Sequence, residues 1–125
     1  MKAIKIQVID LNISNISSLI TALKRMDVNT QIIESYEELD SSCDCIILPG
    51  VGAFGASVEK IKSNISIELL KDEVKVKKKP FLGICVGMQV LAEKGLEFGT
   101  HEGLGWIEGT VEKINAKGIK LFKRK

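Results

Sequence analysis

Short apolar runs alternate along the chain with segments whose apolar residues recur at helical spacing. The apolar runs predict strands over 3–9, 30–33, 45–48 and 80–84. The third of these runs has no polar alternation, which is typical of a central parallel strand that helices cover on both faces. The alternation of strands and helices therefore predicts an α/β fold, a parallel sheet flanked by helices.

The segments between the apolar runs predict amphipathic helices, because their apolar residues share one helical face. Helices are expected over 16–26 with Ser14 or Asn15 as N-cap, from Ser35 through 39, over 56–79 with a break near 63–64, and over 88–93. After Gly95 the pattern changes. Residues 106–114 then predict β structure, either a hairpin or two short antiparallel strands.

Composition and charge exclude several classes of protein. The chain has 125 residues, 45% of them hydrophobic and 27% charged, which suits one globular domain with one core. Its net charge of +2 suggests neither a nucleic-acid partner nor a membrane surface. No apolar run reaches the roughly 18 residues of a membrane span, and the N-terminus lacks the apolar region of a signal peptide. We therefore expect a cytoplasmic protein with reduced cysteines.

The stretch 79–93 carries the strongest candidate chemistry. Cys85 lies where an apolar strand gives way to a helix, with Gly83 two residues before it and Gly87 two residues after it. This is the pattern of a nucleophile elbow, a strained turn that needs glycine on both sides. The N-terminus of the following helix would favour the thiolate, and Gln89 lies on the same helix face. The alternative is a small buried cysteine at a tight turn.

A second candidate segment, 49–55, follows the strand at 45–48 and contains three glycines. Glycines leave backbone N–H groups open to a ligand, although a plain turn after a strand is the alternative. Ligands of parallel α/β sheets bind at the carboxyl ends of the strands. We therefore expect the loops at 10–15 and 49–55 to meet the Cys85 turn, with the sulfur near the backbone of 50–52.

The other cysteines and the histidine do not predict a metal site. Cys43 and Cys45 form a pair before a strand, but a metal needs more ligands, so we interpret both as packing residues. His101 is the single histidine, and we expect it in an exposed loop rather than in a catalytic role. Neither a metal nor a cofactor is expected.

Two strings of residues resemble those of class I glutamine amidotransferases, and more narrowly the glutaminase subunit of imidazole glycerol phosphate synthase. They are Pro49-Gly50-Val51-Gly52-Ala53-Phe54 and Gly83-Ile84-Cys85-Val86-Gly87-Met88-Gln89. A third segment, Gly103 to Gly109, is similar to the family's G-L-G-x-I-x-G string. The resemblance extends to about Leu121. It implies a flavodoxin-like sheet and one type-1 amidotransferase domain over 1–125, of which only the N-terminal part is present.

The resemblance also implies an activity and a partner. The family hydrolyses glutamine to glutamate and passes ammonia to a (β/α)8-barrel synthase in histidine biosynthesis. A relative that aminates sugars in surface-polysaccharide synthesis shares these motifs and stays an alternative. Position by position, the resemblance implies that Cys85 is the nucleophile. It implies that the oxyanion hole is formed by Val86 and by the Gly50–Val51 peptide, which flips in the family. It also implies that glutamine is bound by Gly52, Gln89 and Glu97.

The chain departs from the family pattern in two places. The first loop, Asp10 to Ile16, lacks both glycines of the family's D-Y-G-x-G-N-L, which favours the sugar-aminating branch. The family's catalytic His and Glu form a late H-x-E-like motif that has no match here, and Phe122 to Lys125 replaces the family's P-H-M-G-W-N-like stretch. We therefore expect a truncated gene and weak turnover or none. Two further interpretations of the chain stay open. It is a non-catalytic remnant that keeps the partner-binding surface, or it is an unrelated flavodoxin-like binding domain.

Overall fold

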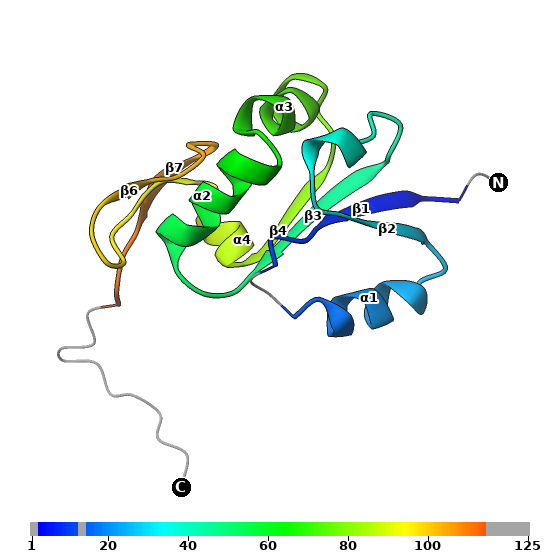
Figure 1. The fold of residues 1–125 in the computed structure, drawn as a ribbon, viewed down its shortest axis with the longest axis horizontal. Helices are drawn as coiled ribbons and strands as arrows, with labels where there is room; N and C mark the ends of the chain where they lie inside the picture. Colours follow the sequence, from blue (N-terminus) through cyan, green and yellow to red (C-terminus); the bar gives the residue numbers. More distant parts are fainter. Residues whose placement is uncertain (1–2, 13–14, 115–125) are drawn as a thin grey trace, which may run out of the picture.

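A computed structural model describes residues 3–12 and 15–114 of the protein, and its centre is a four-stranded parallel sheet (Figure 1). The strands follow the order β2-β1-β3-β4. Their bounds are Lys5–Ile9 for β1, Asn29–Ile33 for β2, Cys45–Gly50 for β3 and Phe81–Cys85 for β4. The four strands predicted from the apolar runs are therefore confirmed, and so is their parallel arrangement.

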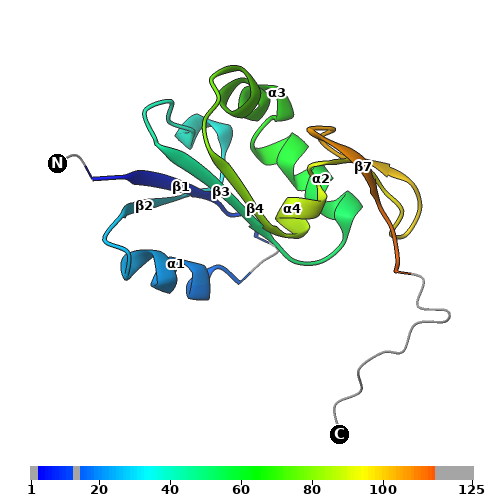
Figure 2. The same ribbon diagram turned by 180° about the vertical axis from the view of Figure 1, so that it is seen from behind.

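Helices cover both faces of this sheet, with α1 on one face and the larger group on the other (Figures 1 and 2). Their bounds are Ser17–Lys24 for α1, Phe54–Asn64 for α2, Ile67–Lys71 for α3 and Val86–Gln89 for α4, with single turns η1 at Tyr36–Glu38 and η2 at Asp72–Val76. The long helix breaks at Ile65–Ser66, next to the predicted point. The N-cap of α1 is Ile16 rather than the predicted Asn15, although Asn15 Oδ1 accepts a hydrogen bond from the Ser17 N–H at 3.1 Å. Ser14, the other predicted cap, lies outside the described residues.

A second, three-stranded sheet corrects two predictions. It consists of β5 (Ala92–Gly95), β6 (His101–Glu102) and β7 (Ile107–Val111), in the order β6-β5-β7. The helix expected over 88–93 ends at Gln89, because the backbone N–H groups of Trp106 and Ile107 both donate to the Leu91 carbonyl and hold the chain in an extended form. The predicted hairpin at 106–114 is wrong as well, since β7 is a single strand parallel to β5.

Packing against the first sheet fixes the second one. Trp106 meets Phe81 of β4 edge to face, with ring centroids 5.3 Å apart. Phe54 of α2 is 1% exposed, and its ring fills the space where a Cβ of Gly95 or Gly103 would stand. These contacts join both sheets in one hydrophobic core. None of the helices in the described part of the chain has the length and apolarity that a membrane crossing needs.

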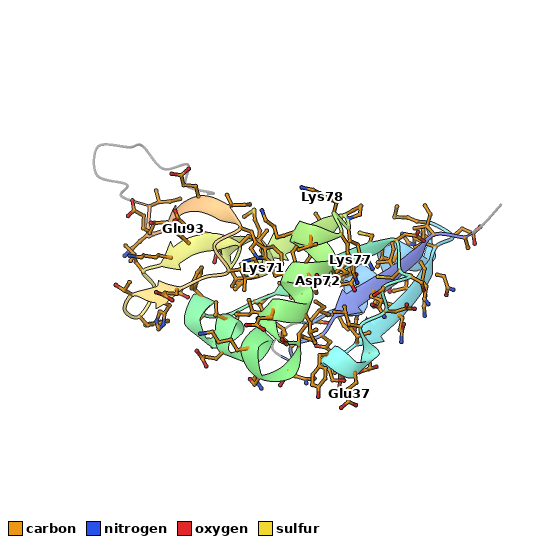
Figure 3. The ribbon with its side chains drawn as sticks, turned by 90° about the horizontal axis from the view of Figure 1, so that it is seen from above. Glu37, Lys71, Asp72, Lys77, Lys78 and Glu93 are labelled. Atoms are coloured by element: carbon orange, nitrogen blue, oxygen red, sulfur yellow. The ribbon has the colours of Figure 1, made fainter. Side chains whose placement is uncertain are left out.

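A buried ion pair holds the amino end of the sheet together. Lys79, just before β4, lies 3.0 Å from Glu73 Oε2, and both side chains are less than a tenth exposed. Ser41 and Lys77 donate to Glu73 Oε1 at 2.7 and 3.0 Å. Figure 3 labels Lys77 and Asp72 on the helical segment that carries this cluster. The pair therefore joins η2 to the segment before β4, and the hydrogen bond from Ser41 links both to the loop before β3.

This cluster predicts a loss of stability in acid. Burial raises the pKa of Glu73, but hydrogen bonds from Ser41, Lys79 and Lys77 outweigh it and bring the pKa to about 2, from an ordinary 4.5. Because the folded pKa is the lower one, the stabilisation is complete above the unfolded pKa and is lost as pH falls from about 4.5 to 2. The carboxyl ¹³C shift of Glu73 should titrate near pH 2. A midpoint near 4.5 would contradict the prediction.

Candidate active site

Neighbouring parallel strands bring the two candidate segments together. In the pairing of β3 with β4, Gly50 stands beside Cys85, the last residue of each strand. A Cβ placed on Gly50 would lie 3.3 Å from the Gly87 nitrogen and 3.5 Å from the Val86 Cβ. The predicted adjacency of the two strands is therefore confirmed, with Gly50 and Cys85 in register, and the approach of the Cys85 sulfur to the backbone of 50–52 stays a prediction. Residues 10–12 follow β1 at the same end of the sheet.

Cys85 has the backbone of a nucleophile elbow. Its φ is 59°, a left-handed conformation that non-glycine residues adopt only at a cost, and its side chain is exposed. A Cβ on Gly83 would lie 2.5 Å from the Gly87 carbonyl oxygen. A Cβ on Gly87 would overlap the carbonyl oxygen of Leu48 in β3. Both glycines are therefore required by close backbone contacts, as the sequence pattern predicts.

The glycine-rich segment forms a shorter loop than the predicted 49–55. Strand β3 continues through Pro49 and Gly50, and α2 begins at Phe54, so that only residues 51–53 connect them. The Ile46 N–H donates to the Pro80 carbonyl on the β4 side, so the N–H groups of residues 45 and 47 point toward β1, as does the nitrogen of Pro49, which carries no hydrogen. Pairing with β1 ends at Ile47, and Pro49 therefore breaks no ladder bond.

The loop residues differ in their exposure and backbone. Val51 is half exposed, and Gly52 has a φ of 98° with open space where a Cβ would stand. Val86 is buried at the start of α4, directly beside Gly50. The predicted oxyanion residues Gly50, Val51 and Val86 are thus neighbours in space.

Gln89 and Glu97, both expected to bind glutamine, line one open cavity of about 460 Å³. Phe54, Phe98 and Val111 line the same cavity. Gln89 lies four residues after Cys85, at the end of α4, but Cys85 and Gly52 are not among the lining residues, so the cavity brings together only two of the predicted site residues. Neither phenylalanine was predicted as a site residue. The sequence did contain one indication of the Phe54 position, the glycines at 95 and 103, which make room for its ring.

Glu97 joins this cavity to the start of α2. Its Oε1 accepts a hydrogen bond from the backbone N–H of Phe54 at 3.2 Å. That N–H belongs to the first turn of α2, where no helical carbonyl is available as a partner and a negative charge is favourable. Glu97 therefore fixes the far end of the loop 51–53.

Replacing Glu97 with alanine should lower the free energy of unfolding by about 1 kcal/mol, the usual effect of losing a cap at a helix N-terminus. The matched control is Glu102→Ala in β6, an exposed carboxylate nearby, which should change stability by less than about 0.5 kcal/mol. Urea unfolding followed by circular dichroism measures both. Equal effects of the two substitutions would show that the Phe54 hydrogen bond contributes nothing.

His101 corrects another prediction, since it belongs to strand β6 and is only half exposed. Its ring lies where a Cβ of Gly55 would stand, and its Nε2 is 3.2 Å from the Phe98 carbonyl oxygen. Phe98 itself is 86% exposed and has a φ of 56°. The contact with α2 explains the burial, because glycine at 55 leaves a flat surface on the helix.

The cysteines do not form a shared site. Cys43 is buried, Cys45 is half buried, and both are free, as is Cys85. Burial raises the pKa of the Cys45 thiol. Within the described residues, no three His, Cys, Asp or Glu side chains gather in a way that would hold a metal ion.

Comparisons with known proteins agree with the fold and with the motifs. The family model for glutamine amidotransferase class-I matches residues 7–120. A protein of Vibrio vulnificus, strain YJ016, named imidazole glycerol phosphate synthase subunit HisH 2, is 44% identical over 108 residues, which is 86% of this chain and 50% of that one. The subunit HisH of Leptospira interrogans is 42% identical over 110 residues, covering 88% and 53%. The chain thus spans about half the length of the curated relatives it matches.

A solved structure of a Listeria monocytogenes EGD-e protein described as peptidase E has a similar fold. Its TM-score is 0.67 at 13% sequence identity, and the match covers 85% of this chain and 64% of that one. At this low sequence identity, the similarity supports a shared fold and no shared function. Together with the strand order, it confirms the flavodoxin-like parallel sheet.

Proposed function

The chain belongs to the class I glutamine amidotransferase family, and on that premise we propose that it carries the nucleophile and the glutamine-binding residues of a glutaminase. The observation that carries this proposal is the register of Gly50 beside Cys85, with a left-handed backbone at the cysteine. We regard residues 1–125 as part of one amidotransferase domain.

In this proposal the Cys85 sulfur attacks the carboxamide carbon of glutamine, and a C–S bond forms. The oxygen becomes an oxyanion, which the N–H of Val86 and the Gly50–Val51 peptide stabilise. The C–N bond then breaks, and the nitrogen leaves as ammonia after it takes up a proton. Water hydrolyses the thioester and releases glutamate. Gly52, Gln89 and Glu97 hold the substrate beside the elbow.

The relatives' names support a subunit of imidazole glycerol phosphate synthase, so the proposed partner is a (β/α)8-barrel synthase that receives the ammonia. The altered first loop, Asp10 to Ile16, keeps a sugar-aminating partner as the second candidate. The three free cysteines support a reducing compartment, and we place the protein in the cytoplasm.

A diazoketone analogue of glutamine tests the nucleophile directly. We expect it to modify Cys85 alone, as read by mass spectrometry of proteolytic peptides, because the Cys85 thiol is exposed whereas Cys43 is buried and Cys45 is half buried. Cys85→Ala should abolish labelling, whereas Cys45→Ala, which also removes a thiol, should leave it unchanged. Glu97→Ala and Gln89→Ala should slow it. Equal labelling of Cys45 would contradict the proposal.

Turnover needs more than a nucleophile, because a proton has to reach the leaving nitrogen, a contribution of about 10²–10⁴-fold in rate. His101 is the sole histidine of the sequence, and its ring contacts Gly55 and Phe98. For the 125-residue polypeptide we therefore expect labelling without appreciable glutamine hydrolysis. Hydrolysis at an enzyme's usual rate that His101→Ala abolishes would show that His101 is the base.

A further inference from the structure

The connection between β5 and β6, residues 96–100, contains a phenylalanine in an unfavourable backbone conformation. Phe98 has a φ of 56°, and Gly99 after it has a φ of 109°. A bulky residue rarely adopts a left-handed backbone, so contacts with its surroundings have to hold it there. Phe98 lines the same cavity as Gln89 and Glu97. The conformation of this connection therefore shapes the wall of the cavity.

His101 makes a hydrogen bond that closes the connection. Its Nε2 lies 3.2 Å from the carbonyl oxygen of Phe98. A carbonyl oxygen can only accept a hydrogen bond, so the hydrogen of this bond is on Nε2. The same nitrogen would lie 3.8 Å from a Cβ placed on Gly99. The imidazole ring is thus beside both residues that have a positive φ.

Helix α2 fixes the imidazole ring in turn. Gly95 and His101 are opposite each other in the pairing of β5 with β6. A Cβ on Gly95 would lie 2.4 Å from the ring of Phe54, and a Cβ on Gly55 would lie 2.6 Å from His101 Nδ1. Each ring therefore packs against a glycine of the other element, where α2 lies beside the second sheet (Figure 1).

We propose that His101 is a positioning residue for the binding of glutamine, an inference that rests on the proposed function. Its hydrogen bond to Phe98 holds residues 96–100 in the conformation that places Glu97 and Phe98 at the wall of the cavity. Glu97 is bonded to the first N–H of α2, so the connection is attached to the same end of this helix twice. In this role His101 acts through its two neighbours and takes no proton from Cys85.

The kinetics of Cys85 labelling test this role. The rate is measured against the concentration of the diazoketone analogue of glutamine, which gives an apparent KI and a maximal rate. His101→Phe keeps a ring against Gly55 but has no N–H donor. We expect its KI to rise about tenfold, the effect of one lost hydrogen bond, with an unchanged maximal rate. His101→Gln, which restores a donor, should recover most of the affinity.

Iodoacetamide separates positioning from a merely structural role, because it has no amino-acid group that the cavity could bind. It should label Cys85 at the wild-type rate in His101→Phe. A residue that only supported the fold would change this rate as well. Glu102→Gln is the matched control, since the neighbouring side chain in β6 is exposed, and its KI should stay that of the wild type.

Gly55→Ala displaces the imidazole ring without altering the histidine. Alanine favours a helix more than glycine does, so α2 itself should not be weakened. The added Cβ would meet the His101 ring, a side chain that can rotate away and thereby lose its bond to Phe98. We expect the KI to rise as in His101→Phe. Circular dichroism confirms that each variant folds.

The tautomer of His101 can be measured in the wild type, where it is the single histidine of the sequence. Long-range ¹H–¹⁵N spectra of the neutral ring should show the hydrogen on Nε2. A hydrogen on Nδ1 alone would overturn this inference. Saturable labelling with the wild-type KI in both His101→Phe and Gly55→Ala would also overturn it, and would leave the proposed function intact. Labelling of the wild type that never saturates would overturn both.

Discussion

Gly87→Ala is expected to prevent the protein from folding stably. The added Cβ overlaps the carbonyl oxygen of Leu48, a backbone atom in the central strand β3, so no flexible side chain can move aside. Leu48 is fully buried, and shifting it would disturb the core. Overlap with a buried backbone is among the few mechanisms that cost about 4 kcal/mol or more. Urea unfolding and near-ultraviolet circular dichroism measure the loss.

The matched control is Gly105→Ala. Gly105 has a φ of 70°, but nothing lies within 4 Å of a Cβ placed there. Gly105→Ala therefore measures the loss of stability caused by an alanine in a left-handed conformation, about 1 kcal/mol, without any overlap. If Gly87→Ala were no worse than Gly105→Ala, the close contact between the elbow and β3 would not exist in solution.

Glu73→Ala is expected to cost about 3–5 kcal/mol, because it leaves the buried ammonium of Lys79 without its counter-ion. Lys79 would keep only neutral partners, among them the carbonyl oxygens of Asp40 and Ser41. The side chain of Lys79 is 6% exposed, so water cannot replace the carboxylate without local opening. Thermal and urea unfolding should both show the loss.

Asp72→Ala is the control for Glu73→Ala, since Asp72 is the preceding carboxylate and also lies near Lys77, at 3.4 Å. Its side chain is half exposed, so its removal should cost less than about 1 kcal/mol. The double variant Glu73→Leu with Lys79→Met removes both charges and should recover much of the stability. Without such recovery, the cost of Glu73→Ala would come from lost packing rather than from the unpaired lysine.

The pattern of apolar runs predicts the first sheet, because each buried strand contributes such a run and the helices between them show a clear period. The same rule misplaces residues 90–93. Leu91 and Ala92 favour a helix locally, but the backbone bonds from Trp106 and Ile107 to the Leu91 carbonyl are formed by residues far along the chain. Local propensity contains no information about such a partner.

The elbow is predictable for a different reason. Gly83, Cys85 and Gly87 form a local pattern whose cause, close backbone contact, acts within a few residues and against one neighbouring strand. The burial of His101 against Gly55 depends on how the second sheet meets α2, and nothing local to either residue indicates it. Only Gln89 and Glu97 were predicted among the residues that line the cavity. Phe54 and Phe98 also line it, but they come from separate elements, so no local pattern indicates that they meet there.

The three residues between β3 and α2 have fixed ends. Gly50 is held in register beside Cys85, and the N–H of Phe54 is held by Glu97. A link this short cannot swing as a lid, but a single peptide plane within it can rotate while both anchors stay in place. Any change in the direction of the Val51 N–H is therefore a local event, expected on the nanosecond-to-microsecond scale of loop motion rather than the slower scale of domain closure.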